Sequence, residues 1–435
     1  MKRAIIDFNK RVKKIGAHHS LSYALRGGRK HIDRIHEAVG EDALYTRIRE
    51  STSGYGKSVD VPYIFRRFDA DANDPASYYF PQTDTVMRDA STYAKHLIYT
   101  LGGPYERREP RIYCTVPTDV EKWADVCCNI IRHYNCGLWD GFEYGIEYFE
   151  IWNEPDNPIF WNGSEEQYFA LYAAAARKIK AIDPSYKVGG ASFSLADERG
   201  FAFAEHFLSF ILKNDLPLDF FSYHACDLDP ESIAYRMARV REMLTRYGKP
   251  LEVFQTGWAC VDEHGDERTR FDHLRTARGA AYAAAVMSLA QASDNGAPFT
   301  APASMTYDVR ASSQYGSMIE WYGEWQKPIY SLIAYKTLYA LGTEVLSEGY
   351  GLYTTAATDG DGKGAILVSN FDDRVERAEL LVKGFGSFRA TYRVLDETRD
   401  LVLAKTEEYC GGEESAVLAA ELRGYTTLLI ELERI

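Results

Sequence analysis

The segment at residues 147–190, EYFEIWNEPDNPIFWNGSEEQYFALYAAAARKIKAIDPSYKVGG, decides the fold. It begins with a β-rich run at 147–152 and ends with another at 187–190. Between them, Ser164 and the glutamine three residues later have the spacing of a capping box, and apolar residues then recur at helical intervals up to an Asp-Pro pair. A strand, a helix and a second strand in this order predict a parallel α/β fold.

The same alternation extends over most of the chain. Further β-rich runs fall at 14–18, 43–48, 96–101, 218–223, 252–256 and 303–308. Segments of helical period fall at 29–39, 83–93, 118–134, 164–182, 200–213, 230–247, 270–291 and 328–341. Together with the two runs above, this makes eight strand and helix pairs. The pattern predicts a (β/α)8 TIM barrel, whose active site lies at the C-terminal ends of the strands.

The pattern changes after residue 342. Short alternating runs such as GAILVSNFDD, FRATYRVLDE and YTTLLIELERI are joined by Gly, Asp and Asn, which is typical of antiparallel strands. We therefore expect a catalytic barrel at 13–342 and a small antiparallel β-sandwich at 343–435. The first residues, 1–12, could add a strand to that sandwich.

Composition excludes several classes of function. The chain has 435 residues, 46% of them hydrophobic, which is enough for a large core. Its 63 acidic and 50 basic residues give a net charge of -13, which opposes binding to nucleic acid or to an anionic membrane. The start has no long apolar stretch, and the seven cysteines lack metal spacing. We expect a cytoplasmic protein with reduced thiols; the oligomeric state stays open.

Glu154 is the first candidate for chemistry, because it follows the fourth predicted strand at the barrel rim. Trp152 and Trp161 flank it and could stack on a sugar and lower the local polarity, so that Glu154 keeps its proton near neutral pH. Asn153 could hold a neighbouring hydroxyl. The alternative is that Asn-Glu-Pro merely ends a strand, since Pro155 cannot continue a ladder.

Four segments together are similar to one family of enzymes. They are EIWNEPDNPIFWNGSEEQYFALYAAAARKIKAIDPSYKVGGAS (150–192), DFFSYHAC (219–226), GKPLEVFQTGWACV (248–261) and MTYDVRASSQYGSMIEWYGEWQKPIYSLIAYKTLYALG (305–342). They resemble glycoside hydrolase family 39, which contains β-xylosidases and α-L-iduronidases and belongs to a clan of retaining (β/α)8 glycosidases. The resemblance implies that Glu154 is the general acid/base and that Asn153 binds the hydroxyl next to the reacting carbon.

The resemblance also implies a wall of substrate-binding residues. For His224 the alternative is a core histidine with satisfied hydrogen bonds, and for Arg47, Arg49 and Glu50 it is a rim ion pair of small energy. The expected binding set, beside Asn153, is Trp152, Trp161, Tyr223, His224, Trp258, Tyr307, Asp308, Arg310, Arg47 and Glu50.

The position of the family nucleophile is Gly257. A retaining glycosidase needs a second carboxylate about 5–5.5 Å from the first, and a glycine cannot supply it. Four explanations stay open: an inverting enzyme with another base, a nucleophile from a neighbouring loop or from the substrate, a Glu-to-Gly replacement by engineering, or a protein that binds glycans without cleaving them. The candidate carboxylates elsewhere are Asp308, Asp227, Glu50, Glu320 and Glu324. If the absent carboxylate at residue 257 is all that prevents the retaining reaction, Gly257→Glu should restore retaining hydrolysis.

Other classes of function remain as alternatives. A sugar-binding pseudoenzyme with a tail domain for assembly is one. A metal hydrolase is another, but His18, His19 and His224 are too few and too scattered to favour it. No metal or organic cofactor is implied, because glycosidic cleavage needs only proton transfer and a nucleophile. The expected partner is a carbohydrate, with no nucleic acid and no membrane.

Overall fold

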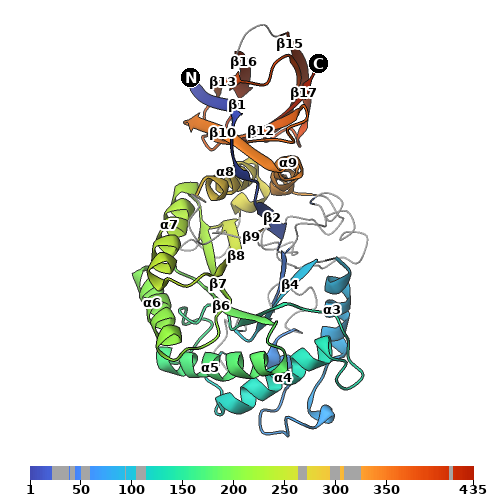
Figure 1. Ribbon diagram of the computed structural model, residues 1–435, viewed down its shortest axis with the longest axis vertical. Helices are drawn as coiled ribbons and strands as arrows, with labels where there is room; N and C mark the ends of the chain where they lie inside the picture. Colours follow the sequence, from blue (N-terminus) through green and yellow to red (C-terminus); the bar gives the residue numbers. More distant parts are fainter. Residues whose placement is uncertain are drawn as a thin grey trace.

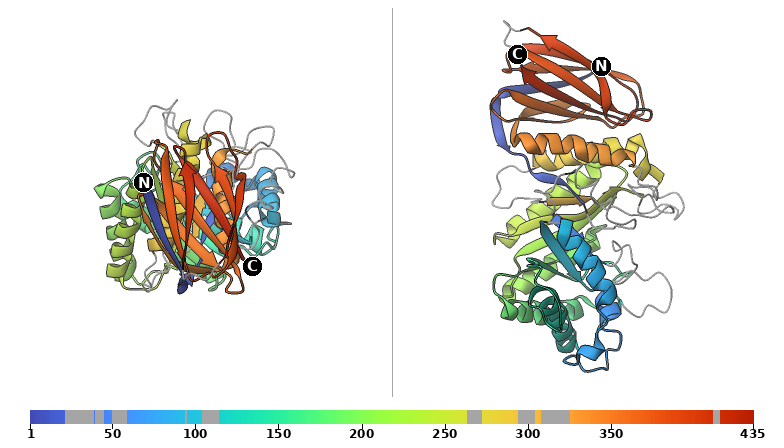
Figure 2. Two further views of the ribbon diagram at one scale, coloured as in Figure 1. Left: turned by 90° about the horizontal axis from the view of Figure 1, so that it is seen from above. Right: turned by 90° about the vertical axis from the view of Figure 1, so that its right-hand side faces the viewer.

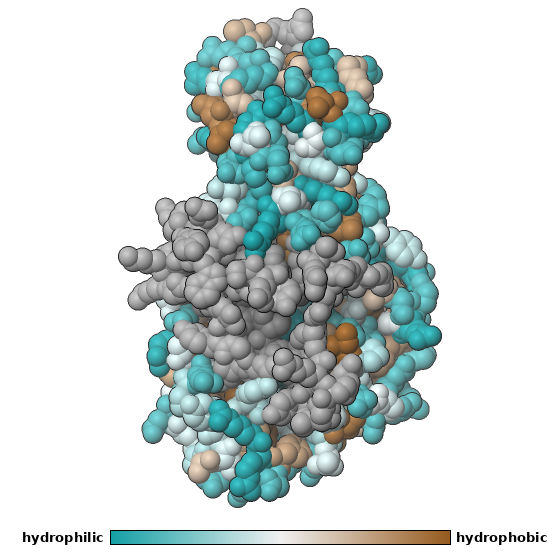
Figure 3. Space-filling model, turned by 180° about the vertical axis from the view of Figure 1, so that it is seen from behind, coloured by the Kyte–Doolittle hydropathy of each residue, from teal (hydrophilic) through white to brown (hydrophobic). Residues whose placement is uncertain are grey.

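A computed structural model describes residues 1–21, 39, 45–49, 59–93, 95–103, 114–262, 272–293, 304–307, 325–410 and 415–435. Within these ranges the chain forms a barrel and, packed beside it, a second sheet (Figure 1). Hydrophilic side chains cover most of the described flanks of both parts in the view of Figure 3. None of the helices described is long and apolar enough to span a bilayer.

The barrel sheet has eight described strands, ordered β2-β9-β8-β7-β6-β5-β4-β3, and every hydrogen-bonded neighbour pair is parallel. Contacts between β2 and β3 bring the two ends of this order together. The strands are β2 (Ala17–Leu21), β3 (Tyr45–Ile48), β4 (His96–Leu101), β5 (Tyr148–Ile151), β6 (Lys187–Phe193), β7 (Phe220–Asp227), β8 (Glu252–Cys260) and β9 (Ser304–Tyr307). The predicted TIM barrel is thus confirmed.

The first predicted barrel strand was displaced. The sequence predicts a strand at 14–18, whereas the barrel strand is β2 at Ala17–Leu21. Residues Lys2–Lys14 form a separate strand, β1, which pairs with the second sheet. The predicted run therefore combines the last residue of β1 with the first residues of β2.

Helices follow the strands and form the outer layer seen in Figure 1. They are α2 (Val61–Ile64), α3 (Pro81–Tyr93), α4 (Val120–Asn135), α5 (Glu165–Ile182), α6 (Glu198–Lys213), α7 (Pro230–Tyr247), α8 (Ala277–Ser293) and α9 (Lys327–Leu341), with short 3-10 turns η2 (Pro75–Ser77) and η3 (Asp272–Arg275). The capping box at Ser164 is present, and Gly248 ends α7 with a φ of 75°. Most of the helix predicted at 29–39 lies outside the described residues.

Aromatic side chains close the N-terminal end of the barrel interior. Tyr148, Phe220 and Phe254 pack with Ile98 in a cluster of their own, and the ring centroids of Tyr148 and Phe254 lie 5.3 Å apart. These residues belong to the first half of their strands. The open, chemically useful end of the barrel is therefore the C-terminal one.

The second sheet has nine strands in the order β15-β14-β17-β12-β11-β10-β1-β13-β16. Its strands after the barrel are β10 (Thr343–Tyr350), β11 (Tyr353–Thr358), β12 (Lys363–Asn370), β13 (Glu376–Lys383), β14 (Phe388–Leu395), β15 (Val402–Tyr409), β16 (Ser415–Leu422) and β17 (Thr426–Arg434). All described pairs are antiparallel except β1 with β13. The sheet folds over an apolar core of its own, which gives the predicted sandwich.

Helices α8 and α9 lie between the barrel and the second sheet (Figure 2). The hydroxyl of Ser369 on β12 donates a 2.6 Å hydrogen bond to the carbonyl oxygen of Ala281 on α8. The guanidinium of Arg278 lies 5.7 Å from the ring centroids of both Phe371 and Tyr425. The helices therefore pack against both the barrel and the second sheet.

Candidate active site

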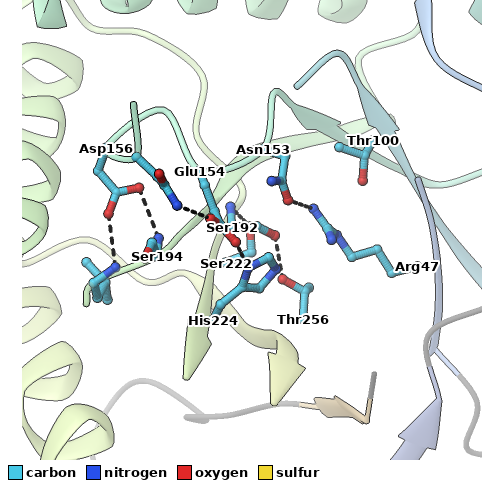
Figure 4. A network of polar contacts seen from close by, with 12 residues as sticks. Arg47, Thr100, Asn153, Glu154, Asp156, Ser192, Ser194, Ser222, His224 and Thr256 are labelled. Atoms are coloured by element: carbon cyan, nitrogen blue, oxygen red, sulfur yellow. Dashed lines mark hydrogen bonds and ion pairs between the residues drawn. The ribbon is translucent and has the colours of Figure 1, made fainter. Parts of the chain in front are cut away.

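The chain makes a tight turn directly after β5, and this turn presents Glu154. Trp152 and Glu154 have φ angles of 73° and 47°, a left-handed conformation that costs a residue with a side chain about 1–3 kcal/mol. The backbone N–H of Glu154 donates to the carbonyl oxygen of Ala191 at 2.9 Å, and that of Asn157 donates to the carbonyl oxygen of Glu154 at 3.0 Å. β6 and the turn thus hold Glu154 in place (Figure 4).

The carboxylate of Glu154 has two side-chain partners. Its Oε1 lies 2.5 Å from Nδ1 of His224, and its Oε2 accepts a 2.8 Å hydrogen bond from the amide of Asn157. Burial raises the pKa of Glu154, but the hydrogen bonds from His224 and Asn157 and the positive charge of Arg49 outweigh it, so the pKa lies below its usual value. The expectation of a protonated Glu154 is therefore wrong for the unliganded site, because polar donors, not the tryptophans, surround the carboxylate.

His224 lies on β7, opposite Gly257 on β8 in the parallel ladder. Burial lowers the pKa of His224, while the hydrogen bond and charge of Glu154 raise it; burial is the larger effect. A Cβ atom built on Gly257 would lie 2.9 Å from Cδ2 and 3.1 Å from Nε2 of this ring. The imidazole thus occupies the space beside the glycine and also touches Glu154.

A second carboxylate, that of Glu150, lies inside the barrel two residues before Trp152. Its Oε2 accepts hydrogen bonds from Arg47 Nε at 2.7 Å, Arg47 Nη2 at 2.5 Å and Thr100 at 2.7 Å. Its Oε1 accepts from the hydroxyls of Ser192 at 2.6 Å and Ser222 at 2.7 Å. Burial raises the pKa of Glu150, but Arg47 and these hydroxyls lower it below its usual value. Both carboxylate oxygens already accept at least two hydrogen bonds from the protein, so the charge of Glu150 holds the surrounding strands together.

Arg47 joins this network to Asn153. The same Nη2 atom that binds Glu150 donates to Oδ1 of Asn153 at 2.8 Å. Oδ1 is therefore engaged, whereas Nδ2 of Asn153 is buried and has no hydrogen-bond partner within the described part of the chain. Arg47 is 2% exposed and pairs with the buried Glu150, so it does not lie in the rim ion pair that the sequence offered as the alternative to substrate binding. Arg47 thus positions the side chain of Asn153.

The three tryptophans are packed into the protein. Trp152, Trp161 and Trp258 are 2%, 3% and 0% exposed, and the rings of Trp152 and Trp161 meet edge to face with centroids 5.0 Å apart. The indole N–H of Trp152 donates to the carbonyl oxygen of Phe160, and that of Trp161 donates to the carbonyl oxygen of Ser164. Little ring surface is left to stack on a sugar, which does not support that expectation. Trp152 borders a cavity of about 270 Å³ whose lining includes Phe65 and Trp123.

The remaining predicted residues fall into two groups. Tyr223 is buried and its hydroxyl donates to Oε1 of Gln255 at 3.3 Å. Asp227 lies at the end of β7, 3.7 Å from Arg236. The backbone of Tyr307 pairs with Trp258 and Leu21. Outside the described residues lie Glu50, Asp308, Arg310, Glu320 and Glu324.

Sequence reasoning missed Asp156 and Asn157 in the same turn. Burial and the charge of Glu154 raise the pKa of Asp156 to about 7, although it accepts 2.9 Å hydrogen bonds from the backbone N–H groups of Ser194 and Leu195. It also missed Glu150, for which a signal existed: a carboxylate in the apolar run YFEIW must be buried and needs a cation. Among the described residues, no group of three or more His, Cys, Asp or Glu could hold a metal ion.

Comparison with known proteins confirms the resemblance. Residues 111–261 match the model of glycosyl hydrolases family 39. A β-xylosidase of Geobacillus stearothermophilus is 34% identical over 117 residues, 26% of this chain and 21% of that protein. A β-xylosidase of Caldicellulosiruptor saccharolyticus is 31% identical over 158 residues, 33% of this chain and 31% of that protein. The chain thus matches less than a third of the length of these curated relatives.

The fold has a wider match. The crystal structure of a glucosidase from Croceicoccus marinus superposes with a TM-score of 0.76, at 21% identity, over 100% of this chain and 99% of that chain. At this identity the likeness concerns the fold alone, and it covers both the barrel and the second sheet.

Proposed function

We propose that the chain is a glycosidase of family 39, whose model matches residues 111–261, and that its proton donor is Glu154. The reaction takes place at the C-terminal mouth of the barrel, where β5 ends. Two relatives with detectable sequence identity are β-xylosidases, so β-xylosides are the first substrates to try. The substrate is a carbohydrate in either case.

The observation that supports this proposal is the pair Asn153 and Glu154. Asn153 has a buried amide N–H that no described residue accepts, and the next residue is a carboxylate held by His224 and Asn157. A buried donor without a partner is costly, and a ligand hydroxyl would satisfy it. Cleavage of a glycoside uses a proton-transfer group and, beside it, a group that hydrogen-bonds a hydroxyl of the sugar. Glu154 and the amide of Asn153 have this arrangement.

Protonation of Glu154 has to come with the substrate. The pKa of the carboxyl is held low by donors in the unliganded site. A sugar in the mouth would exclude water and strengthen the effect of burial, which raises the pKa. The substrate complex, and not the free protein, is then the state in which Glu154 takes up the proton that it passes to the leaving oxygen.

Glu154→Gln tests the proposal with paired substrates. We expect loss of hydrolysis of glycosides with poor leaving groups, by about 10²–10⁴-fold, and a much smaller loss for nitrophenyl glycosides, which need no proton on departure. Glu147→Gln is the matched control, because Glu147 precedes the same strand and is half exposed. Equal losses on both kinds of substrate would show that Glu154 is not the acid.

A second candidate, a glycan-binding protein without hydrolysis, is favoured by Gly257 alone. Removal of a nucleophile forfeits several powers of ten in rate while leaving the binding residues in place. Binding of xylo-oligosaccharides without product formation, on every glycoside tried, would favour this candidate over the glycosidase.

A further inference from the structure

His224 occupies the space in which a side chain at residue 257 would begin. The Cβ atom built on Gly257 meets Cδ2 at 2.9 Å, Nε2 at 3.1 Å and Cγ at 3.3 Å of the imidazole. A contact of 2.9 Å forces one of the two residues to move. Gly257 has no positive φ, so its backbone does not require a glycine. What the glycine provides is room for the ring of His224.

Glu154 determines which ring nitrogen carries the proton. Nδ1 of His224 lies 2.5 Å from Oε1 of Glu154, and an ionised carboxylate can only accept a hydrogen bond. The pKa values of both groups lie below their usual values, for the reasons given above. Near neutral pH the pair is therefore a carboxylate with a neutral imidazole, protonated at Nδ1. The lone pair of the ring is on Nε2.

This lone pair has no partner. Nε2 is buried and makes no hydrogen bond to any described residue. Leaving a buried acceptor unpaired costs about 1–3 kcal/mol, and such groups are found where a water or a substrate completes the site. The neighbouring Asn153 has a buried donor in the same condition. The two unpaired atoms belong to residues adjacent to Glu154, one in sequence and one in contact.

We propose that Nε2 of His224 is the general base that stands in for the absent carboxylate, and that hydrolysis inverts the anomeric configuration. The inference rests on the proposed glycosidase function. A water bound to Nε2 gives its proton to that nitrogen while its oxygen forms the new bond to the anomeric carbon. The bond from that carbon to the leaving oxygen breaks, and the electron pair goes to the leaving oxygen.

The proton balance closes within the pair. As Nε2 gains a proton, the Nδ1 proton passes to Glu154, and the carboxylic acid so formed protonates the leaving oxygen. The pair ends with as many protons as it had, now on Nε2, and exchange with solvent returns the proton to Nδ1. A phenolate leaving group needs no proton, so for such substrates Glu154 only orients the ring.

His224→Asn is the discriminating variant, because asparagine keeps an N–H near the position of Nδ1 but has no nitrogen at Nε2. On aryl β-xylosides we expect kcat/KM to fall about 10²–10⁴-fold while the melting temperature stays close to that of the wild type. Added imidazole should restore part of the rate to His224→Ala. The control is His206→Asn, since His206 also bonds a carboxylate, Glu165 at 2.8 Å, but on the exposed surface.

The outcomes separate the two proposals. Inverted products, observed by proton NMR of the first-formed sugar, together with an impaired His224→Asn, support the base. Retained configuration, or an active His224→Asn, contradicts the proposal that His224 is the base, while the proposed glycosidase function is unaffected. If the wild type hydrolyses no glycoside, both the proposed glycosidase function and the proposed role of His224 are contradicted. Nitrogen-15 NMR gives a reading without turnover: a proton on Nε2 of His224 at neutral pH contradicts the proposal.

Discussion

At the scale of single residues, Gly257 changes the charge of Glu154 as well as the chemistry. In a site with two close carboxylates, each charge raises the pKa of the other, which keeps the acid protonated. Here the neighbour is a neutral imidazole that donates to Glu154, so the pKa of the carboxyl falls below its usual value. The proposed loss of a nucleophile at residue 257 would thus also remove the repulsion that protonates its partner.

The contact of His224 with residue 257 decides what Gly257→Glu will do. The new Cβ would lie 2.9 Å from the ring, so the ring must move and the hydrogen bond to Glu154 breaks. We expect the single variant to be no better than the wild type on nitrophenyl glycosides. The double variant Gly257→Glu, His224→Ala makes room for the carboxylate and should hydrolyse them with retained configuration.

Product configuration measured by NMR distinguishes these variants. Addition of Glu154→Gln to the double variant should abolish hydrolysis of substrates with poor leaving groups, which serves as the control. Retaining hydrolysis by the single variant would mean that His224 leaves its position easily, contrary to the crowding described.

At the scale of secondary-structure elements, the pair of Arg47 on β3 and Glu150 on β5 ties two strands together across the barrel interior. Arg47→Met would leave Glu150 buried without its cation, and we expect the free energy of unfolding to fall by about 3–5 kcal/mol. The variant Arg47→Met, Glu150→Gln removes the unpaired charge and should recover most of this loss. Urea unfolding at pH 7 measures both; a loss below about 1 kcal/mol for Arg47→Met would contradict the structural role.

β2 carries two buried histidines, His18 and His19, which contact the ring of Tyr335 on α9. Burial lowers the pKa of each to about 3; for His18 the charges of His19 and Lys13 add to this effect, and for His19 that of Lys336. The unfolded chain binds these protons near pH 6.5 and the folded chain does not. Stability is therefore complete above pH 6.5 and falls as the pH drops toward 3.

The size of this effect can be measured. Between pH 6.5 and pH 5 the loss corresponds to about 2 kcal/mol for each ring. We expect the free energy of unfolding of the wild type to fall between pH 7 and pH 5 by several kcal/mol more than that of His18→Gln, His19→Gln. His206→Gln is the control, because its ring is exposed. Parallel pH curves for the wild type and the double variant would contradict the burial of neutral rings.

The sequence predicted the positions of the strands better than it predicted which side chains contact each other. Seven of the eight β-rich runs overlap a barrel strand closely, since alternation and caps are local properties. The position of Glu154 at the end of β5 followed from the same reasoning. The side-chain partners did not, because the contacts of Glu154 with His224 and of Arg47 with Glu150 join residues far apart in sequence. The burial of the three tryptophans was not predicted for the same reason: spacing along the chain does not show whether a ring is covered.

At the scale of the whole molecule, the barrel and the second sheet share α8. The ring of Phe371 lies between Tyr282 on α8 and Tyr425, with centroids 6.1 Å and 5.4 Å away. We expect Phe371→Ala to lower the free energy of unfolding by about 3 kcal/mol, because it opens a gap in this contact. The exposed Tyr350→Ala should change it by less than about 0.5 kcal/mol.

Calorimetry shows whether the two parts depend on each other. We expect one unfolding transition for the wild type. Two transitions, of which Phe371→Ala shifts only the later one, would mean that the barrel and the sheet unfold separately and that the shared helix does not couple them.

β1 has a consequence for the order in which the protein can be made. It lies between β10 and β13, and Ile5 pairs with Glu348 on one side and Leu381 on the other. Synthesis proceeds from the N-terminus, so β1 leaves the ribosome before either neighbour exists, and the whole barrel is translated in between. Until then β1 has two unpaired edges and an apolar face formed by Ala4, Ile6 and Phe8. A nascent chain that stalls within the barrel therefore exposes β1 as an unpaired, aggregation-prone strand. We expect a chaperone to bind this segment.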